Sequence, residues 1–309
     1  MSTAFIFPGQ GSQAVGMGKE LADEFPAARR VFEEADDALG TSISKLCFEG
    51  PIETLTQTAN TQPAILTCSV AALAVLREET SVTADVCLGH SLGEYSALVA
   101  AGALKLADAV RVVRARGEAM QAAVAEGEGA MAAVMGLPAD DVEAVCAEAA
   151  QGQVCAPANE NGGGQIVVAG HAEAIGRLVA LVKSRKARAI PLKVSAPFHC
   201  ALMQPAADAL AAVLEPVALG ALEVPVVSNV EATANSDTSR IKSLLIQQVT
   251  HRVRWEASVQ YVSESMGVTQ AYELGHGKVL AGLLRRINRE VEVRGVRSPA
   301  DISVLKDDQ

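Results

Sequence analysis

The chain has 309 residues, half of them hydrophobic, which suits one large or two modest domains with a substantial core. Its formal net charge of −10 argues against a nucleic acid as partner. No charged segment precedes an apolar stretch at the N-terminus, so we expect no signal peptide. The longest apolar run, residues 64–76, is too short and too polar to span a bilayer, so we expect a cytoplasmic protein that does not enter a membrane.

The side chains available for the core are mostly aliphatic, because aromatic residues make up only 3% of the chain. Six cysteines occur, and no two of them form a CxxC pair. They are residues 47, 68, 87, 146, 155 and 200. Four of them lie inside apolar runs, so we interpret the cysteines as reduced, buried thiols.

The chain opens with a short apolar strand, residues 3–7, followed by the sequence PGQGSQ at residues 8–13. Glycines directly after a first strand lie where a ligand often approaches the backbone. Residues 9–14 also fit a GxGxxA dinucleotide fingerprint. That interpretation needs a second strand ending in an acid about twenty residues further on. A helix over residues 19–39 is predicted instead, so we disfavour a dinucleotide site.

Residues 86–95 (VCLGHSLGEY) have the pattern of a nucleophile elbow, a buried strand that turns sharply into a helix. Side chains in place of Gly89 and Gly93 would collide with the neighbouring strand and helix, and Ser91 would sit in strained backbone. At a helix N-terminus, the backbone N–H of Leu92 points to where an oxyanion would develop. A serine that only caps the helix is the alternative.

Residues 127–195 have an internal order of strand, helix, two strands, helix and strand. The predicted ranges are 130–135, 140–149, 153–158, 165–169, 172–184 and 188–194. This β-α-β-β-α-β order is the ferredoxin-like pattern, so we predict an inserted subdomain that divides a core of residues 1–126 and 196–309.

Strands alternate with helices on both sides of this insert, which predicts a mostly parallel sheet covered on both faces. The strands are expected at 85–88, 225–229, 269–273 and 291–296, and the helices at 92–124, 202–214, 239–266 and 279–287, with another opening at residues 62–63. Residues 306–309 are expected to form a mobile tail.

A serine hydroxyl reacts only when a base takes its proton, and His199 is the candidate base. The other histidines are residues 90, 171, 251 and 276. His199 follows the insert, where the chain re-enters the core, and in enzymes of the α/β-hydrolase type the base also follows the serine. No acid between Ser91 and His199 is an obvious third member, so a backbone carbonyl could orient the imidazole.

Arg116 falls on the apolar stripe of a predicted helix, residues 107–124, at about 100° per residue. An unpaired buried charge is costly, so the guanidinium needs an anionic partner. That partner is either a distant Asp or Glu or a ligand whose carboxylate or phosphate accepts two hydrogen bonds. The sequence leaves both possibilities open.

Taken together, five motifs resemble the malonyl-CoA:acyl-carrier-protein transacylases, in that family's order and spacing. They lie at residues 7–13, 89–95, 116–121, 159–165 and 195–203. The resemblance implies an α/β protein with an α/β-hydrolase-like core and a ferredoxin-like insert. It also implies malonyl-CoA and holo acyl carrier protein as partners, and no cofactor and no metal.

The resemblance further implies roles for single residues. Ser91 would take the malonyl group, and His199, oriented by the main-chain carbonyl of Gln248, would act as base and then as acid. Gln10 and the N–H of Leu92 would form the oxyanion hole. Arg116 would pair with the malonyl carboxylate, and the other substrate-binding candidates are Phe198, Asn159, Asn161 and Met120.

Both implied partners are anionic although the protein itself is negative, so we expect docking on local basic clusters. These clusters are Lys183–Arg188 with Lys193, and Arg285, Arg286 and Arg289. The alternative is that both are ordinary solvated surfaces with no binding role. We expect a monomer. The alternative functions are a serine esterase or thioesterase of similar fold, and a non-catalytic module that binds carrier proteins, which an intact Ser91 and His199 disfavour.

Overall fold

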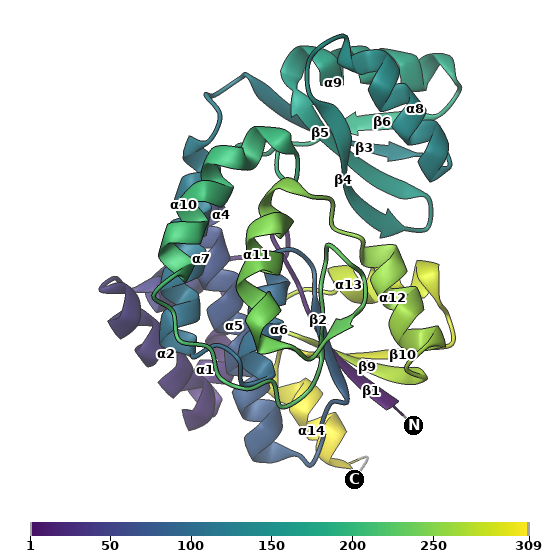
Figure 1. The fold of residues 1–309 in the computed structure, drawn as a ribbon. Helices are drawn as coiled ribbons and strands as arrows, with labels where there is room; N and C mark the ends of the chain where they lie inside the picture. The colour runs from purple at the N-terminus through teal and green to yellow at the C-terminus, as the bar shows by residue number, and fades with distance from the viewer. Residues whose placement is uncertain (1, 308–309) are drawn as a thin grey trace.

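The computed structural model describes residues 2–307, which form an α/β core with a smaller subdomain above it (Figure 1). The core sheet has six strands in the order β10-β9-β1-β2-β7-β8. They are β1 (Ser2–Phe7), β2 (Val86–Gly89), β7 (Val226–Val227), β8 (Ala234–Asn235), β9 (Val268–Leu274) and β10 (Glu292–Val296). Every pair is parallel except β7 with β8. The prediction of a mostly parallel sheet is therefore confirmed.

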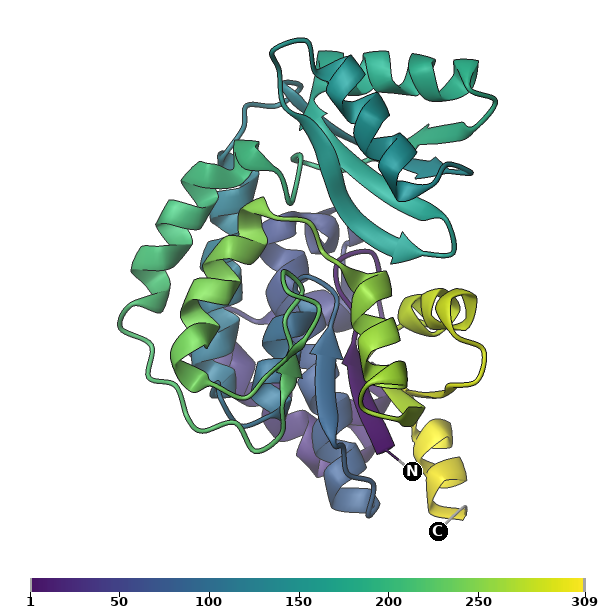
Figure 2. The same ribbon diagram turned by 45° about the vertical axis from the view of Figure 1, so that its right-hand side comes forward.

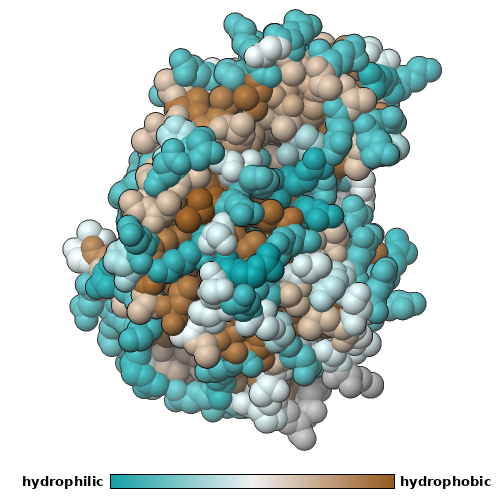
Figure 3. All heavy atoms as spheres, viewed as in Figure 1, coloured by the Kyte–Doolittle hydropathy of each residue, from teal (hydrophilic) through white to brown (hydrophobic). Residues whose placement is uncertain are grey.

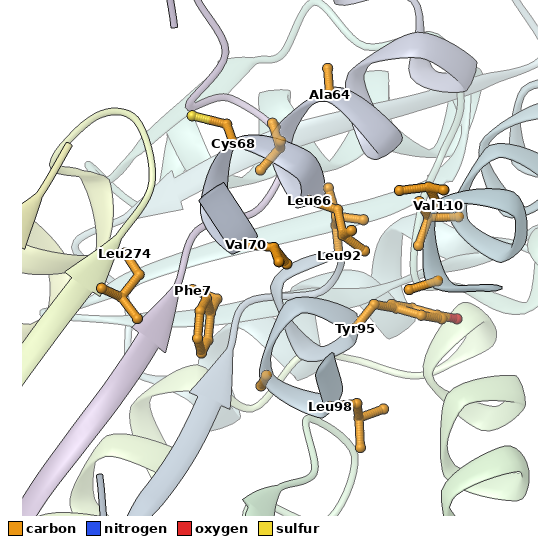
Figure 4. Close-up of a cluster of buried hydrophobic side chains, with 14 of the residues drawn as sticks. Phe7, Ala64, Leu66, Cys68, Val70, Leu92, Tyr95, Leu98, Val110 and Leu274 are labelled. Carbon is orange, nitrogen blue, oxygen red and sulfur yellow. The ribbon is translucent and has the colours of Figure 1, made fainter. Parts of the chain in front are cut away.

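Helices cover both faces of this sheet, which explains why β1 is apolar without alternation. Phe5 and Phe7 face one layer, and Ala4 and Ile6 face the other. The first layer contains α2 (Pro26–Leu39), α5 (Thr58–Glu79), α6 (Gly93–Ala100), α7 (Leu106–Ala122), α10 (Gln204–Leu214) and α11 (Ile241–Thr250). The second contains α12 (Trp255–Glu264) and α13 (Val279–Ile287). Figure 4 shows Phe7 packed near Val70 and Leu92 in the first layer.

The insert folds in the predicted β-α-β-β-α-β order, and its sheet is antiparallel, with the strand order β4-β5-β3-β6. Its elements are β3 (Gly129–Met135), α8 (Ala139–Ala150), β4 (Cys155–Gly162), β5 (Gln165–His171), α9 (Ala172–Ser184) and β6 (Arg188–Pro191). Side chains alternate along β3, because Met131 packs toward the core whereas Ala132 packs under α8 and α9. The insert sheet thus lies between its helices and the core (Figure 2).

Several element boundaries differ from the predictions. The single helix expected at residues 19–39 is broken at Phe25 into α1 (Lys19–Glu24) and α2, because Pro26 begins a new helix. The stretch 239–266 is likewise two helices, with an extended segment before Trp255. The last strand of the insert ends at Pro191 and not at residue 194.

Other elements were not predicted at all. They are α3 (Ile43–Glu49), α4 (Ile52–Thr56), β8 and α14 (Pro299–Asp307), whereas the short 3-10 helices Ala201–Met203 and Thr238–Arg240 overlap the starts of the predicted helices 202–214 and 239–266. Residues 306 and 307 of the expected mobile tail belong to α14, so that prediction is wrong for them. Residues 308 and 309 lie outside the described part of the chain.

Helix α5 extends the apolar run 64–76 to 22 residues, long and apolar enough by composition to cross a membrane. It begins at Thr58, a turn before the expected start, and carries Pro63 inside it. However, 83% of its most apolar window is buried inside the protein, so α5 is a core helix. The surface seen in Figure 3 mixes hydrophilic and hydrophobic residues over core and insert. All six cysteines are free thiols, and all but the half-buried Cys155 are buried, as predicted.

Candidate active site

Ser91 lies at the tight turn between β2 and α6, and its backbone is left-handed, with φ 51°. A Cβ atom at Gly89 would lie 2.0 Å from the backbone of Gly93, and one at Gly93 would lie 2.0 Å from the carbonyl oxygen of Phe7. The turn is therefore possible only with glycines at both positions. The predicted strain at Ser91 and the predicted reason for its flanking glycines are both confirmed.

His199 contacts Ser91 directly. Its Nε2 lies 2.8 Å from Ser91 Oγ, and its Nδ1 lies 2.8 Å from the carbonyl oxygen of Gln248. With Nδ1–H donating to that carbonyl, Nε2 is free to accept the serine proton. His199 is also in left-handed backbone, with φ 61°, and no local sequence pattern predicts this conformation.

The electrostatic surroundings keep His199 neutral. Burial, followed by the nearby Arg116 cation, lowers the pKa of His199 from 6.5 to about 3. The hydrogen bond to the Gln248 carbonyl acts in the opposite direction and is outweighed. An unprotonated imidazole within hydrogen-bond reach of a hydroxyl is the arrangement that general-base chemistry requires.

Arg116 lies on the buried stripe of α7, as predicted, and is 2% exposed. Its Nη2 donates to Ser91 Oγ at 3.1 Å and to Gln248 Oε1 at 2.9 Å, and its Nη1 donates to Gln62 Oε1 at 2.8 Å. Its Nε is buried without a partner among the described residues. Each of these acceptors is neutral. Within the described chain no ion pair includes Arg116, so the geometry favours a ligand carboxylate over a structural Asp or Glu.

One cavity of about 260 Å³ brings the predicted site residues together. Its lining includes Gln10, Ser91, Leu92, Arg116, Met120, Asn159, Asn161, Phe198 and His199, together with apolar residues of the insert and of α13. Gln248 does not line the cavity and touches the site from behind. The dinucleotide interpretation fails here, because five helices separate β1 from β2.

The insert reaches the serine through His90. The imidazole Nε2 of His90 lies 2.8 Å from Oδ1 of Asn161 on β4, and both residues line the cavity. Gln10, from the loop after β1, donates through Nε2 to Thr58 Oγ1 at 3.4 Å. Core and insert thus form opposite walls of one site.

The sequence interpretation missed two amide side chains that hold this site. Asn229 accepts the N–H of Ser91 through Oδ1 at 2.7 Å and donates through Nδ2 to the carbonyl of Gly89 at 2.7 Å, fixing the elbow from both sides. Gln62 accepts from Arg116. Their signals were an amide at the carboxyl end of a predicted strand and one at the start of an apolar helix.

Comparison with known proteins places this geometry in a class. The family model of the acyl transferase domain matches residues 4–277, which include the insert, most of the core and the site residues from Gln10 to Gln248. The fold and the site are thus those of an acyltransferase, an enzyme that transfers an acyl group.

Its relatives define the family more closely. The chain is 48% identical over 303 residues to the malonyl CoA-acyl carrier protein transacylase of Bacillus subtilis, covering 97% of this chain and 95% of the relative. It also resembles the crystal structure of acyl-carrier-protein-S-malonyltransferase from Bartonella henselae, with a TM-score of 0.95, 50% identity and 98% of each chain covered. The chain belongs to the malonyl CoA-acyl carrier protein transacylase family.

A second similar structure contains a type II PKS acyl-carrier protein in complex with its malonyl-transacylase. The present chain and the matched chain of that structure align over their full lengths, with a TM-score of 0.96 and 42% identity.

Proposed function

We propose that this protein moves a malonyl group from CoA to the phosphopantetheine thiol of an acyl carrier protein through a malonyl-Ser91 intermediate. The observation that carries the proposal is the buried guanidinium of Arg116, 3.1 Å from the Oγ of a serine that also contacts His199. The names of the relatives and the carrier-protein complex of a similar transacylase support it.

In the first half-reaction, Ser91 Oγ attacks the thioester carbonyl while His199 Nε2 takes its proton. The new C–O bond forms, and the tetrahedral oxyanion accepts hydrogen bonds from the N–H of Leu92 and from Nε2 of Gln10. When the C–S bond breaks, His199 returns the proton to the departing CoA thiol. In the second half-reaction the carrier thiol attacks the malonyl ester, with His199 again serving as base and then as acid toward Ser91.

Arg116 would select the acyl group. The malonyl carboxylate would accept hydrogen bonds from the guanidinium, which has only neutral partners in the cavity. An esterase or thioesterase that acts on neutral acyl groups gains nothing from a buried cation beside its serine. Arg116 therefore favours the malonyl transacylase over the esterase.

The carrier protein would dock over α13. The side chains of Val279, Leu280 and Leu283 on this helix line the cavity, and Arg285, Arg286 and Arg289 at its end line an adjacent surface cleft. The other basic cluster begins with Lys183–Arg188 at the end of α9, which the insert sheet separates from the core, and only its last member, Lys193, lies between the cavity-lining residues Leu192 and Val194. Arg185 is also paired with Glu148, at 2.8 Å. The α13 arginines are thus the better placed of the two clusters for an anionic carrier.

Intact-mass analysis tests the proposal. Mixing the protein with malonyl-CoA should add one malonyl group at Ser91, and holo acyl carrier protein should remove it and gain the same mass. A wild-type protein that forms no adduct, or one whose adduct passes to water as fast as to the carrier, would refute the transacylase. We further propose that the enzyme acts as a cytoplasmic monomer without metal or cofactor, and size-exclusion chromatography and activity in the presence of a chelator check this.

A further inference from the structure

Glu94 is a buried carboxylate to which the proposed mechanism gives no role. It lies on α6, one turn after Ser91, and is only 3% exposed. Its Oε2 accepts the side-chain N–H of Gln248 at 2.7 Å and the backbone N–H of Asn229 at 3.1 Å. On another side it borders a small cavity lined mainly by apolar residues such as Leu98 and Ile241. Burying such a group is costly, so the site must require it.

The side chain of Gln248 joins Glu94 to Arg116. Its Oε1 accepts from Arg116 Nη2 at 2.9 Å, while its Nε2 donates to Glu94 Oε2 and, at 3.0 Å, to the carbonyl of Ser91. An amide has one accepting end and one donating end. A reversed amide would direct its NH₂ group at the guanidinium and its oxygen at the carboxylate. Both contacts would be repulsive, so the two charges favour the observed orientation.

Glu94 holds this orientation through its negative charge. Burial raises the pKa of Glu94 to about 7, while the hydrogen bonds from Gln248 and Asn229 lower it. A neutral group at this position carries a donor as well as an acceptor, so it would tolerate either orientation of the Gln248 amide, whereas the carboxylate accepts only from its NH₂ end. The carboxylate therefore fixes the donating end of Gln248, which leaves the accepting end for Arg116.

We propose that Glu94 is a positioning residue for acyl selection, which acts through Gln248 to hold the Arg116 guanidinium at the acyl pocket. The inference rests on the proposed function, because it concerns the same malonyl site. The main-chain carbonyl of Gln248 orients His199, and its side chain orients Arg116. Gln248 thus links the base, His199, to the group that recognises the substrate, Arg116. Glu94 fixes the side-chain orientation on which the contact with Arg116 depends.

Glu94 also accepts from Asn229, which supports the serine turn, so a purely structural role has to be separated from this one. A distorted turn would slow acylation by any acyl-CoA, mainly through kcat. A misplaced Arg116 would weaken only the binding of an acyl group with a free carboxylate, mainly through KM. Malonyl-CoA and acetyl-CoA therefore distinguish the two roles.

The experiment measures Ser91 acylation by malonyl-CoA and by acetyl-CoA in the wild type, in Glu94→Gln and in Ser96→Ala. Ser96 is the matched control, since it is buried on the same helix without a hydrogen-bond partner among the described residues. We expect Glu94→Gln to lower kcat/KM for malonyl-CoA at least tenfold, mostly through KM, and to leave acetyl-CoA within twofold. Ser96→Ala should change neither. Equal losses for both substrates, or no loss, would overturn the proposal.

A double-mutant cycle tests the route through Gln248. Gln248→Ala removes the side chain and keeps the main-chain carbonyl that His199 uses. In that background, Glu94→Gln should alter the malonyl-to-acetyl ratio less than twofold, whereas an undiminished effect would show that Glu94 does not act through Gln248. If Glu94→Gln fails to fold, Glu94→Asp, which withdraws the carboxylate by one methylene, should lower the same ratio. A wild type without a malonyl adduct would refute the proposed function, not this link.

Discussion

The core and the insert build opposite walls of one cavity, and they do so by different means. The core contributes Ser91 and His199, both in left-handed backbone, and Arg116, which is 2% exposed. The segment that follows the last strand of the insert contributes Leu192 and Val194, which are 36% and 38% exposed. Each core group is held by several hydrogen bonds, whereas the insert wall combines apolar side chains with the amides of Asn159 and Asn161.

This difference indicates a division of labour. Strained backbone and buried charge persist only where surrounding structure fixes them, and they concentrate where chemistry takes place. A wall contributed by a separate small subdomain can adapt to a substrate without disturbing the reacting atoms. Substitutions of Ser91 or His199 in the core should therefore abolish the chemistry, and substitutions in the insert should alter binding.

The largest expected effect is that of Ser91→Ala, which removes the nucleophile. Malonyl transfer should fall at least ~10³-fold, because the remaining groups cannot form the covalent intermediate. Intact-mass analysis should find no adduct on the variant. An adduct of wild-type yield would show that another residue carries the acyl group. The claim that the core carries the chemistry through Ser91 would then be wrong.

Asn161→Ala tests the insert wall. The change leaves the His90 N–H without its acceptor, at a cost of about 1 kcal/mol, so KM for malonyl-CoA should rise roughly fivefold with kcat nearly unchanged. Steady-state kinetics with a small thiol as acceptor measure both constants. A fall in kcat as large as that of Ser91→Ala would mean that the insert takes part in the chemistry itself.

Charge reversal compares the two basic clusters. Arg285→Glu with Arg286→Glu should raise KM for the acyl carrier protein several-fold and leave KM for a small thiol unchanged, because only the carrier is a large anionic partner. The set Lys183→Glu, Arg185→Glu and Lys186→Glu should act in the same direction and more weakly. Equal effects on carrier and small thiol would argue against docking at either cluster.

The smallest expected effect is that of pH. Since the pKa of His199 is lowered to about 3, the base stays unprotonated well below the ordinary range of histidine. The rate of Ser91 acylation by acetyl-CoA, which has no free carboxylate for Arg116 to bind, should therefore vary less than about twofold between pH 8 and pH 5.5. Stopped-flow acylation over this range checks it. A rate that declines with a midpoint near 6.5 would show that the imidazole is less isolated than its burial indicates.

Much of this division could be predicted from the sequence. The glycines beside Ser91 and the apolar stripe around Arg116 are local patterns, and both predictions agree with the structure. The order of strands and helices predicted the parallel core sheet and the ferredoxin-like insert. The break at Pro26 was also available locally, because the residue before a proline disfavours helix.

The hydrogen bonds that support the site could not be predicted from local sequence patterns. Asn229 meets Ser91 across 138 positions, and Glu94 meets Gln248 across 154. Nothing in the sequence near either residue specifies its partner. The left-handed backbone of His199 is likewise imposed by tertiary structure, since histidine has no local need for it.

The central claim is that Arg116 recognises the free carboxylate of an acyl group bound to Ser91. The most direct test is Ser91 acylation in Arg116→Ala, followed by intact mass, with malonyl-CoA and acetyl-CoA in parallel. We expect malonyl acylation to lose about 2 kcal/mol or more, roughly a thirtyfold fall in rate, while acetyl acylation keeps its wild-type value. An equal fall for both acyl groups would contradict the account.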